Sequence, residues 1–329
     1  MVVVAVAGGT SPALGRSIVT ALHFHPAHIP IVLSRNSMVP QWLFDLGVEI
    51  RRVNYLSLRS LTATLKGVHT VISLLKPLDD TWAFSQINLL NAAIAVGAKR
   101  FAPSEFAIGP KAAEKMPEMA PRIGVWQACE AAVEDQRKNG HVFEWCRFVC
   151  GMFMNYLGYG CEREEEAMSG KGDDGEFLFF QRDGTLRVEI PIMSMKELES
   201  GERKVPRIVL TEIGDMGRFV AAACALPDGK WEVDMGMAGS VMRIDEVVRV
   251  IEEVRKRKME VKYVEMTELE VRQKELQTKE DFIGLFWNDL AMMYARDEEG
   301  EGYFRARVNE LCPEVKALTV KKYMEKFWD

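Results

Sequence analysis

A strand-to-helix turn near the start of the chain carries the residues best suited to bind a ligand. The apolar run VVVAVA (2–7) leads into GGTSPALG (8–15), which leads into the amphipathic stretch GRSIVTALHF (15–24). A glycine-rich turn between a strand and a helix can bind a pyrophosphate, because its N–H groups and the positive end of the helix dipole face the anion. Position and spacing together therefore predict a dinucleotide-binding loop.

The loop departs from the usual pattern at its centre. Gly9 and Gly15 have the spacing of the outer glycines, but Pro12 stands where a middle glycine is usual. Proline removes one N–H donor and biases Ser11 toward an extended backbone. The remaining N–H groups and two hydroxyls still predict binding, although a glycine-rich turn without a ligand is the alternative. The predicted pyrophosphate-binding set is Gly9, Thr10, Ser11, Pro12, Ala13, Leu14 and Gly15.

The end of the second apolar run, IPIVLS (29–34), indicates which dinucleotide would bind. An NAD site usually has a carboxylate here for the ribose hydroxyls, whereas this chain has Ser34 followed by Arg35. A guanidinium is suited to a 2′-phosphate, which it can bind through two parallel hydrogen bonds. Ser34 and Arg35 therefore favour NADP(H), and a surface arginine without a ligand is the alternative.

The first 150 residues alternate short apolar runs with helical patterns. Such alternation is typical of a parallel sheet with crossover helices, and it predicts an α/β fold of the Rossmann type, doubly wound. The expected strands are 2–7, 29–34, 48–53, 70–75, 99–104 and 143–149.

The pattern changes after residue 155. The acidic, glycine-rich stretch 161–177 predicts a solvated loop, and FLFF (177–180) and TLRVEI (185–190) indicate a small second sheet. Residues 207–235 again suggest strand, helix and strand, and helical patterns follow in 244–258 and 267–296. We therefore expect a smaller α+β part beyond the first domain.

The totals exclude several classes of protein. The chain has 329 residues, 48% of them hydrophobic, and a net charge of −6, which argues against nucleic-acid binding. No apolar stretch approaches the roughly 20 residues that span a bilayer, and no secretory signal is visible. The six cysteines form no CxxC pair and have no metal-ligand spacing with the five histidines, so they predict buried thiols, no metal site and a cytoplasmic location.

With these motifs the chain resembles the NmrA-like and isoflavone-reductase-like branch of the atypical short-chain dehydrogenases, in particular its fungal members. The resemblance is carried, nearly end to end, by VAVAGGTSPALGRSIV, LSR, GVHTVISLL, KRFAPSEF, GMFMNYL, LTEIGDMGRFVAAAC and NELCPEVKALTVKKYMEKFW. It implies an NADPH-binding Rossmann domain at 1–155, to whose sheet 207–235 return. It also implies a smaller substrate-binding α+β domain at 156–206 and 236–329.

The resemblance also assigns site residues by motif position. Lys76, Ser104, Phe153 and Asn155 would lie at the cofactor. The cleft between the domains would bind a small-molecule substrate through Glu105, Phe106, Met152, Tyr156 and Tyr159. A homodimer is possible, although the sequence does not determine the oligomeric state.

One catalytic position departs from the family pattern. Reductases of this family carry a lysine at the start of the helix after PSEF, and Arg122 occupies its place. The pKa of a lysine can fall with burial until it exchanges protons near neutrality, whereas a guanidinium stays charged. Arg122 is therefore predicted to orient a substrate or stabilise an oxyanion and to be a poor proton shuttle.

These residues leave three functions open. The first is an NADPH-dependent reductase of an aromatic or polyketide-like molecule in secondary metabolism, suggested by the loop, Arg35 and the apolar segment GMFMNYLGYG (151–160). The second is an NADP(H)-binding regulator without turnover, suggested by the missing lysine. The third is non-redox chemistry, a cyclisation or an elimination. The polar group retained at Arg122 favours an enzyme.

Overall fold

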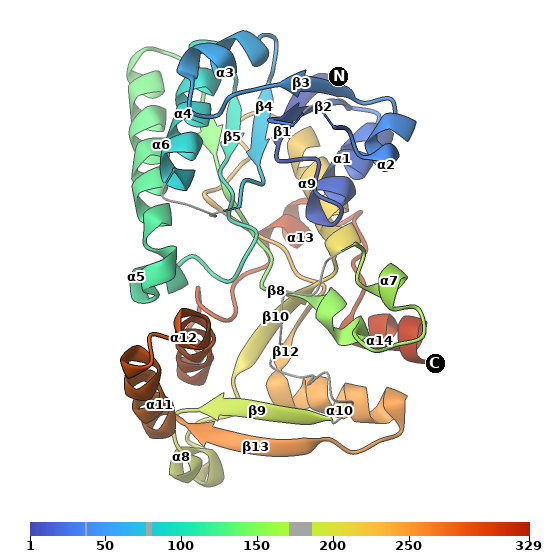
Figure 1. Cartoon of the computed structure of the whole chain (residues 1–329), viewed down its shortest axis with the longest axis vertical. Coiled ribbons are helices and arrows are strands. Elements are labelled where there is room, and N and C mark those ends of the chain that lie inside the picture. Colours follow the sequence, from blue (N-terminus) through green and yellow to red (C-terminus); the bar gives the residue numbers. More distant parts are fainter. Residues whose placement is uncertain (37, 77–80, 171–185) are drawn as a thin grey trace.

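The fold is built on a six-stranded parallel sheet, shown in the upper half of the computed structural model in Figure 1. The structure describes residues 1–36, 38–76, 81–170 and 186–329. The strand order is β3-β2-β1-β4-β5-β6, which is that of a Rossmann-type sheet and confirms the predicted fold class. The strands are β1 (Val2–Ala7), β2 (His28–Ser34), β3 (Glu49–Arg52), β4 (Thr70–Ser73), β5 (Arg100–Ala102) and β6 (Glu144–Trp145).

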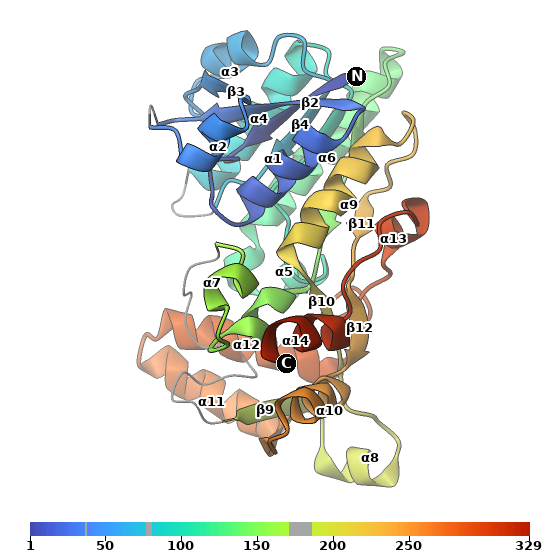
Figure 2. The ribbon, with the colours of Figure 1, turned by 90° about the vertical axis from the view of Figure 1, so that its right-hand side faces the viewer.

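Helices cover both faces of this sheet, which explains why its central strands β1 and β2 read as largely apolar runs. Val4 and Val6 of β1 pack into the core beneath one set of helices, while Ala5 and Ala7 face the other set. In Figure 2, α1 and α9 lie side by side on one face. That face carries α1 (Leu14–Phe24), α2 (Gln41–Asp45) and α9 (Ile213–Ala225), and the other carries α3 (Leu58–Thr64), α4 (Trp82–Ala95) and α6 (Pro121–Lys138).

The expected sixth strand, 143–149, is divided in two. β6 pairs with β5, and the strand is interrupted at Cys146. After this residue, β7 (Arg147–Val149) pairs in parallel with β11 (Asp234–Gly236). The prediction of a single strand was wrong here because the same apolar run serves two different partners. β11 comes from a distant part of the sequence, which local periodicity does not report.

A three-stranded sheet connects the two halves of the molecule and lies between them in Figure 1. It consists of β8 (Met152–Phe153), β10 (Arg207–Thr211) and β12 (Ser240–Arg243), with β10 in the middle. Residues 207–235, expected to return to the Rossmann sheet, are thus divided. β10 belongs to this connecting sheet, α9 packs on α1, and β11 pairs with β7.

The lower half is a two-stranded parallel ribbon with helices around it. The ribbon pairs β9 (Arg187–Ile192) with β13 (Glu260–Glu265), and α12 packs against β9. Its helices are α8 (Met195–Ser200), α10 (Ile244–Arg255), α11 (Met266–Thr278) and α12 (Phe282–Arg296). The helical pattern seen at 267–296 is therefore two helices. FLFF (177–180) lies outside the described residues.

The remaining helical elements are short. They are α5 (Ala112–Lys115), the 3-10 turns Pro117–Met119 and Met154–Gly158, α7 (Glu164–Ala167), α13 (Arg307–Leu311) and α14 (Val320–Trp328). The stretch predicted as a solvated loop from residue 161 instead contains α7, where Ala167 and Met168 are buried. Acidic first-turn residues favour this helix through its dipole, which composition alone does not show. The rest of that stretch, 171–177, is outside the described residues.

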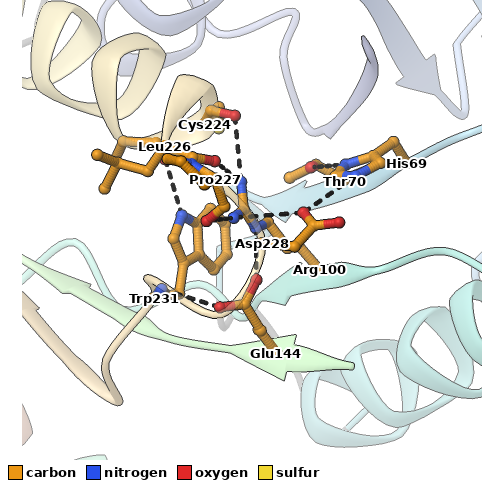
Figure 3. A network of polar contacts seen from close by, with 10 residues as sticks. His69, Thr70, Arg100, Glu144, Cys224, Leu226, Pro227, Asp228 and Trp231 are labelled. Carbon is orange, nitrogen blue, oxygen red and sulfur yellow. Dashed lines mark hydrogen bonds and ion pairs between the residues drawn. The ribbon is translucent and has the colours of Figure 1, made fainter. Parts of the chain in front are cut away.

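A buried arginine ties the amino end of the sheet to the segment after α9 (Figure 3). Arg100 begins β5 and is 1% exposed, and its Nε donates to Oε2 of Glu144 at 2.8 Å. Its other nitrogens donate to the carbonyl oxygens of Cys224, Leu226 and Pro227, and its guanidinium lies over the Trp231 ring. This network uses donors on all three guanidinium nitrogens, so Arg100 is a structural residue.

Candidate active site

A cavity of about 440 Å³ opens at the carboxyl ends of the parallel strands. The turns after β1, β2, β4 and β5 all contribute to it, as expected for a ligand site in an open α/β sheet. It brings together most of the residues predicted from the sequence: Thr10, Ser11, Pro12, Ala13, Leu14, Ser34, Arg35, Lys76, Ser104, Phe106, Arg122 and Phe153.

The loop after β1 is held open by its own hydrogen bonds. The Ser11 hydroxyl accepts from the N–H of Gly15 at 2.9 Å, and the Ser11 carbonyl accepts from the N–H of Arg16 at 2.9 Å. Ala13 is the N-cap of α1 and has no side chain that could accept a hydrogen bond. Among protein groups in the described ranges, the N–H groups of Thr10, Ala13 and Leu14 find no acceptor, so they are available to an anion at the helix terminus.

The glycines of the loop serve its shape. Gly8 has φ +78°, a conformation that side chains other than glycine rarely adopt, and it lines the cavity. A Cβ on Gly9 would lie 3.1 Å from Val6 and Val19, and one on Gly15 would lie 2.7 Å from the Ser11 hydroxyl oxygen. Gly9 and Gly15 do not line the cavity. They let the first helix approach the sheet closely, which is the packing role that the outer glycines of such loops have.

Arg35 lies at the end of β2, exposed and on the rim of the cavity. Within the described residues its guanidinium has no hydrogen-bond or ion-pair partner. Ser34 is buried, and its hydroxyl closes a tight turn by accepting from the N–H of Asn36 at 3.1 Å. The floor beside them is Tyr55, whose hydroxyl donates to the Leu33 carbonyl at 3.0 Å. Burial raises the pKa of this phenol well above its usual range, so it stays neutral.

Arg122 approaches the cavity from the first turn of α6. Its guanidinium lies 5.5 Å from the centre of the Trp82 ring, and its Nε is 3.3 Å from Oε2 of Glu105. That Nε is buried, yet it makes no hydrogen bond to any described residue because the geometry of the pair is poor. Arg122 is the side chain of this cluster that reaches the cavity wall, so it presents a positive charge there.

Glu105 stands behind Arg122. The carboxyl group is 3% exposed and accepts a hydrogen bond from the indole N–H of Trp126 at 3.0 Å. Burial raises its pKa to about 7, against the opposite effect of Arg122, of the Trp126 hydrogen bond and of Arg147. Glu105 does not line the cavity, although the sequence placed it among the substrate-binding residues.

Four other predicted residues also lie away from the cavity lining: Met152, Asn155, Tyr156 and Tyr159. Asn155 is fully buried, and its amide group bonds to Ala167, Ser169, Glu212 and Ile213. Tyr156 stacks against Phe153 with ring centres 6.4 Å apart, and burial raises its pKa to about 12. Tyr156 therefore supports the wall that Phe153 forms.

Several residues of the site were missed by sequence reasoning. Gly170 lines the cavity at φ +73°, and a Cβ there would lie 2.6 Å from the Pro12 carbonyl oxygen. Trp82 and Trp126 enclose the Arg122–Glu105 pair. The spacing of Arg122 and Trp126, four residues apart on one helix face, was a usable signal for the second of these. The sequence contained no signal for the contact between Gly170 and Pro12.

A larger hollow of about 1040 Å³ lies on the other side of the loop, along α1 and α9. It shares Pro12, Ala13 and Gly170 with the first cavity but none of Arg35, Lys76, Ser104 or Arg122. Since these four carry the charges and hydroxyl placed at the strand ends, the smaller cavity is the candidate active site.

Over the described residues, no group of three or more histidine, cysteine, aspartate or glutamate side chains could hold a metal ion. Within the same ranges, no helix is both long and apolar enough to cross a membrane.

The family of the chain follows from comparison with known proteins. The model of the NmrA-like family matches residues 2–288. "Oxidoreductase BOA1" of Botryotinia fuckeliana is 32% identical over 253 residues, which cover 76% of this chain and 75% of that protein. The chain belongs to the NmrA-like family, as the sequence motifs indicated.

Solved structures give the same fold. AtPrR2 with NADP⁺ and (+)pinoresinol superposes with a TM-score of 0.70 at 22% identity, covering 99% of this chain and 98% of that one. The ternary complex of leucoanthocyanidin reductase from Vitis vinifera superposes with a TM-score of 0.65 at 17% identity, covering 98% of both chains. At these identities the likeness concerns the fold.

Proposed function

We propose that this protein is an NADP(H)-dependent oxidoreductase that reduces a small aromatic molecule. The observation that carries the proposal is the joining of three features in one cavity: open N–H groups after β1, Arg35 after β2 and Arg122 from α6. A related fungal protein is named an oxidoreductase, and proteins of the same fold bind NADP⁺, which supports the proposal.

The residues present fit this cofactor. The N–H groups of Thr10, Ala13 and Leu14 would bind the pyrophosphate at the end of α1. Arg35 would bind the 2′-phosphate, since its guanidinium is exposed at the rim and a carboxylate for the ribose is absent from this position. When bound, the reduced nicotinamide supplies a hydride.

Phe106 and Phe153 give the cavity an aromatic wall. Phe106 is itself stacked on Phe148, with ring centres 5.9 Å apart, so the wall is rigid. Flat aromatic surfaces of this kind suit a planar, apolar ligand. Reduction of a carbonyl or a conjugated alkene would then place negative charge on the substrate, where Arg122 can stabilise it. The proton that completes the reduction comes from water, because a guanidinium does not give one up.

A screen of cofactor consumption tests this function. Purified protein is mixed with NADPH and a panel of quinones, aryl ketones and aryl alkenes, and the absorbance of the reduced nicotinamide is followed together with product formation. We expect NADPH to be consumed in step with one product. Tight NADPH binding without turnover against the whole panel would favour a regulator instead. A product formed without NADPH consumption would favour a non-redox enzyme.

A further inference from the structure

The Arg122–Glu105 pair has an arrangement that a simple structural ion pair does not need. Glu105 is almost completely buried, and its carboxylate lies 3.3 Å from the Nε of Arg122. The Arg122 Nε is nevertheless buried without a hydrogen bond within the described residues. Because the two groups are close but poorly aligned, their attraction does not fully compensate for the desolvation of the carboxylate.

We propose that Glu105 is a positioning residue that sets the net charge of the Arg122–Glu105 pair beside the cavity, by alternating between a carboxylic acid and a carboxylate. This inference rests on the proposed function, because it takes Arg122 as the group that meets the reacting molecule. With a neutral Glu105, the pair carries one positive charge beside the cavity. With an ionised Glu105, the pair is neutral overall, and stabilisation of an anion is weaker.

The surroundings of Glu105 allow both states. Arg122 from α6 and Arg147 from β7 favour the carboxylate, and so does the indole N–H of Trp126. Burial favours the acid. Arg147 is itself paired with Asp234. Arg122, in contrast, has no carboxylate partner other than Glu105 among the described residues. The pKa of Glu105, raised to about 7, places the exchange in the physiological range.

The change in protonation of Glu105 makes the electrostatic potential of the site depend on pH, at the position where the family pattern has a lysine. A lysine at this position could exchange protons itself, whereas Arg122 keeps its charge at all relevant pH values. Glu105, which contacts the Arg122 guanidinium, would restore a pH-dependent charge at this position. Anion stabilisation at the cavity should then be strongest below pH 7.

The indole N–H of Trp126 reports the state of Glu105 directly, because it donates to the Glu105 carboxyl group. We would record the ¹H–¹⁵N spectrum of the seven tryptophan indoles as a function of pH and assign Trp126 with Trp126→Phe. The expected result is a titration of the Trp126 resonance with a midpoint near pH 7, absent in Glu105→Gln. This experiment needs neither cofactor nor substrate.

Coupling to Arg122 is tested with two variants. Arg122→Met removes the charge and should move the Trp126 midpoint upward, while Arg122→Lys retains a charge and should leave it closer to wild type. A Trp126 resonance that does not titrate between about pH 5 and 9 would overturn the proposal, as would an equal midpoint in Arg122→Met and wild type. If the midpoint behaves as expected but no nicotinamide cofactor binds, the proposed function fails while the coupled pair stands.

The effect on the cavity is measured with NADH, which lacks the titrating 2′-phosphate. Calorimetric titration of wild type should show affinity about threefold higher at pH 6 than at pH 8, since one charge near the cavity changes. Glu105→Gln should bind NADH with little pH dependence. Equal pH dependence in the two proteins would contradict a role for Glu105 in setting the field of the cavity.

Discussion

Two arginines at opposite ends of the parallel sheet use their guanidinium groups differently. Arg100, at the amino end, donates to a carboxylate and to three carbonyl oxygens and lies over an indole ring (Figure 3). Arg122, at the carboxyl end, has one carboxylate at 3.3 Å, an Nε without a hydrogen bond to described residues, and a cavity beside it. An arginine whose donors are used up holds the fold together, and one with donors to spare can meet a ligand.

The same contrast holds for the whole ends of the sheet. At the amino end, the segment after α9 closes over Arg100 and pairs Glu144 with the N–H of Trp231 at 2.9 Å. At the carboxyl end, the N–H groups that begin α1 and the guanidinium of Arg35 are left open among the described residues. Stability is concentrated at one end and binding capacity at the other.

The largest effect is expected from Arg100→Met. This substitution leaves the 9% exposed Glu144 side chain without its cation, and the carbonyls of Cys224, Leu226 and Pro227 without this donor. Removing one partner of a buried pair costs about 3–5 kcal/mol in the free energy of unfolding. Urea unfolding measures this. Arg122→Met is the matched control, and its free energy of unfolding should fall by less than half as much. Equal decreases in the two variants would contradict the comparison between the two arginines.

The order of the two variants should be reversed for turnover, where Arg122→Met should have the larger effect. Once the screen has found a substrate, Arg122→Met should lower kcat by about 10²–10³-fold, as loss of an oxyanion-stabilising donor does. The folded fraction of Arg100→Met should retain wild-type kcat, because Arg100 lies at the other end of the sheet. Steady-state kinetics at a pH below 7 measures both. A wild-type kcat in Arg122→Met would remove this residue from the reaction.

The third comparison uses two glycines with similar backbone conformations. Gly170 has φ +73° and Gly201 has φ +77°, so the backbone conformation alone should make an alanine at either position cost about 1 kcal/mol in stability. Of the two, only Gly170 is close to the loop after β1. A Cβ added at Gly170 would lie 2.6 Å from the Pro12 carbonyl oxygen, whereas one added at Gly201 would meet open space. Gly170→Ala should therefore weaken NADPH binding measurably in a calorimetric titration, and Gly201→Ala should not. Equal affinities would show that the contact with Pro12 does not shape the loop.

The smallest effect concerns stability as a function of pH. Because the pKa of Glu105 is raised in the folded state, the folded protein binds this proton more tightly than the unfolded chain. That contribution to stability is complete below the unfolded pKa and is lost as the pH rises through about 7. Between about pH 6 and 8, wild type should lose about 1 kcal/mol relative to Glu105→Gln. Parallel pH profiles from urea unfolding would indicate that Glu105 does not titrate here.

The architecture was predictable from local patterns, because strands buried on both faces leave short apolar runs and amphipathic helices leave a period of about 3.6 residues in the sequence. The same holds for the loop after β1 and for Arg35, whose places follow from the strand ends. The division of 143–149 was not predictable, since it depends on β11, which lies far away in the sequence. The roles of Glu105 and Asn155 depend on contacts with α6 and α9, and the motif in which each residue stands does not encode these contacts.

The most direct test of the account is calorimetric titration with NADPH and NADH of wild type, of Arg35→Ala and of Arg59→Ala, which removes an exposed arginine of α3 as a control. We predict that wild type and Arg59→Ala prefer NADPH. Arg35→Ala should lose that preference, because a charge-assisted hydrogen bond contributes about 1.5–3 kcal/mol. Failure of both nucleotides to bind, or an unchanged preference in Arg35→Ala, would contradict the proposed cofactor site.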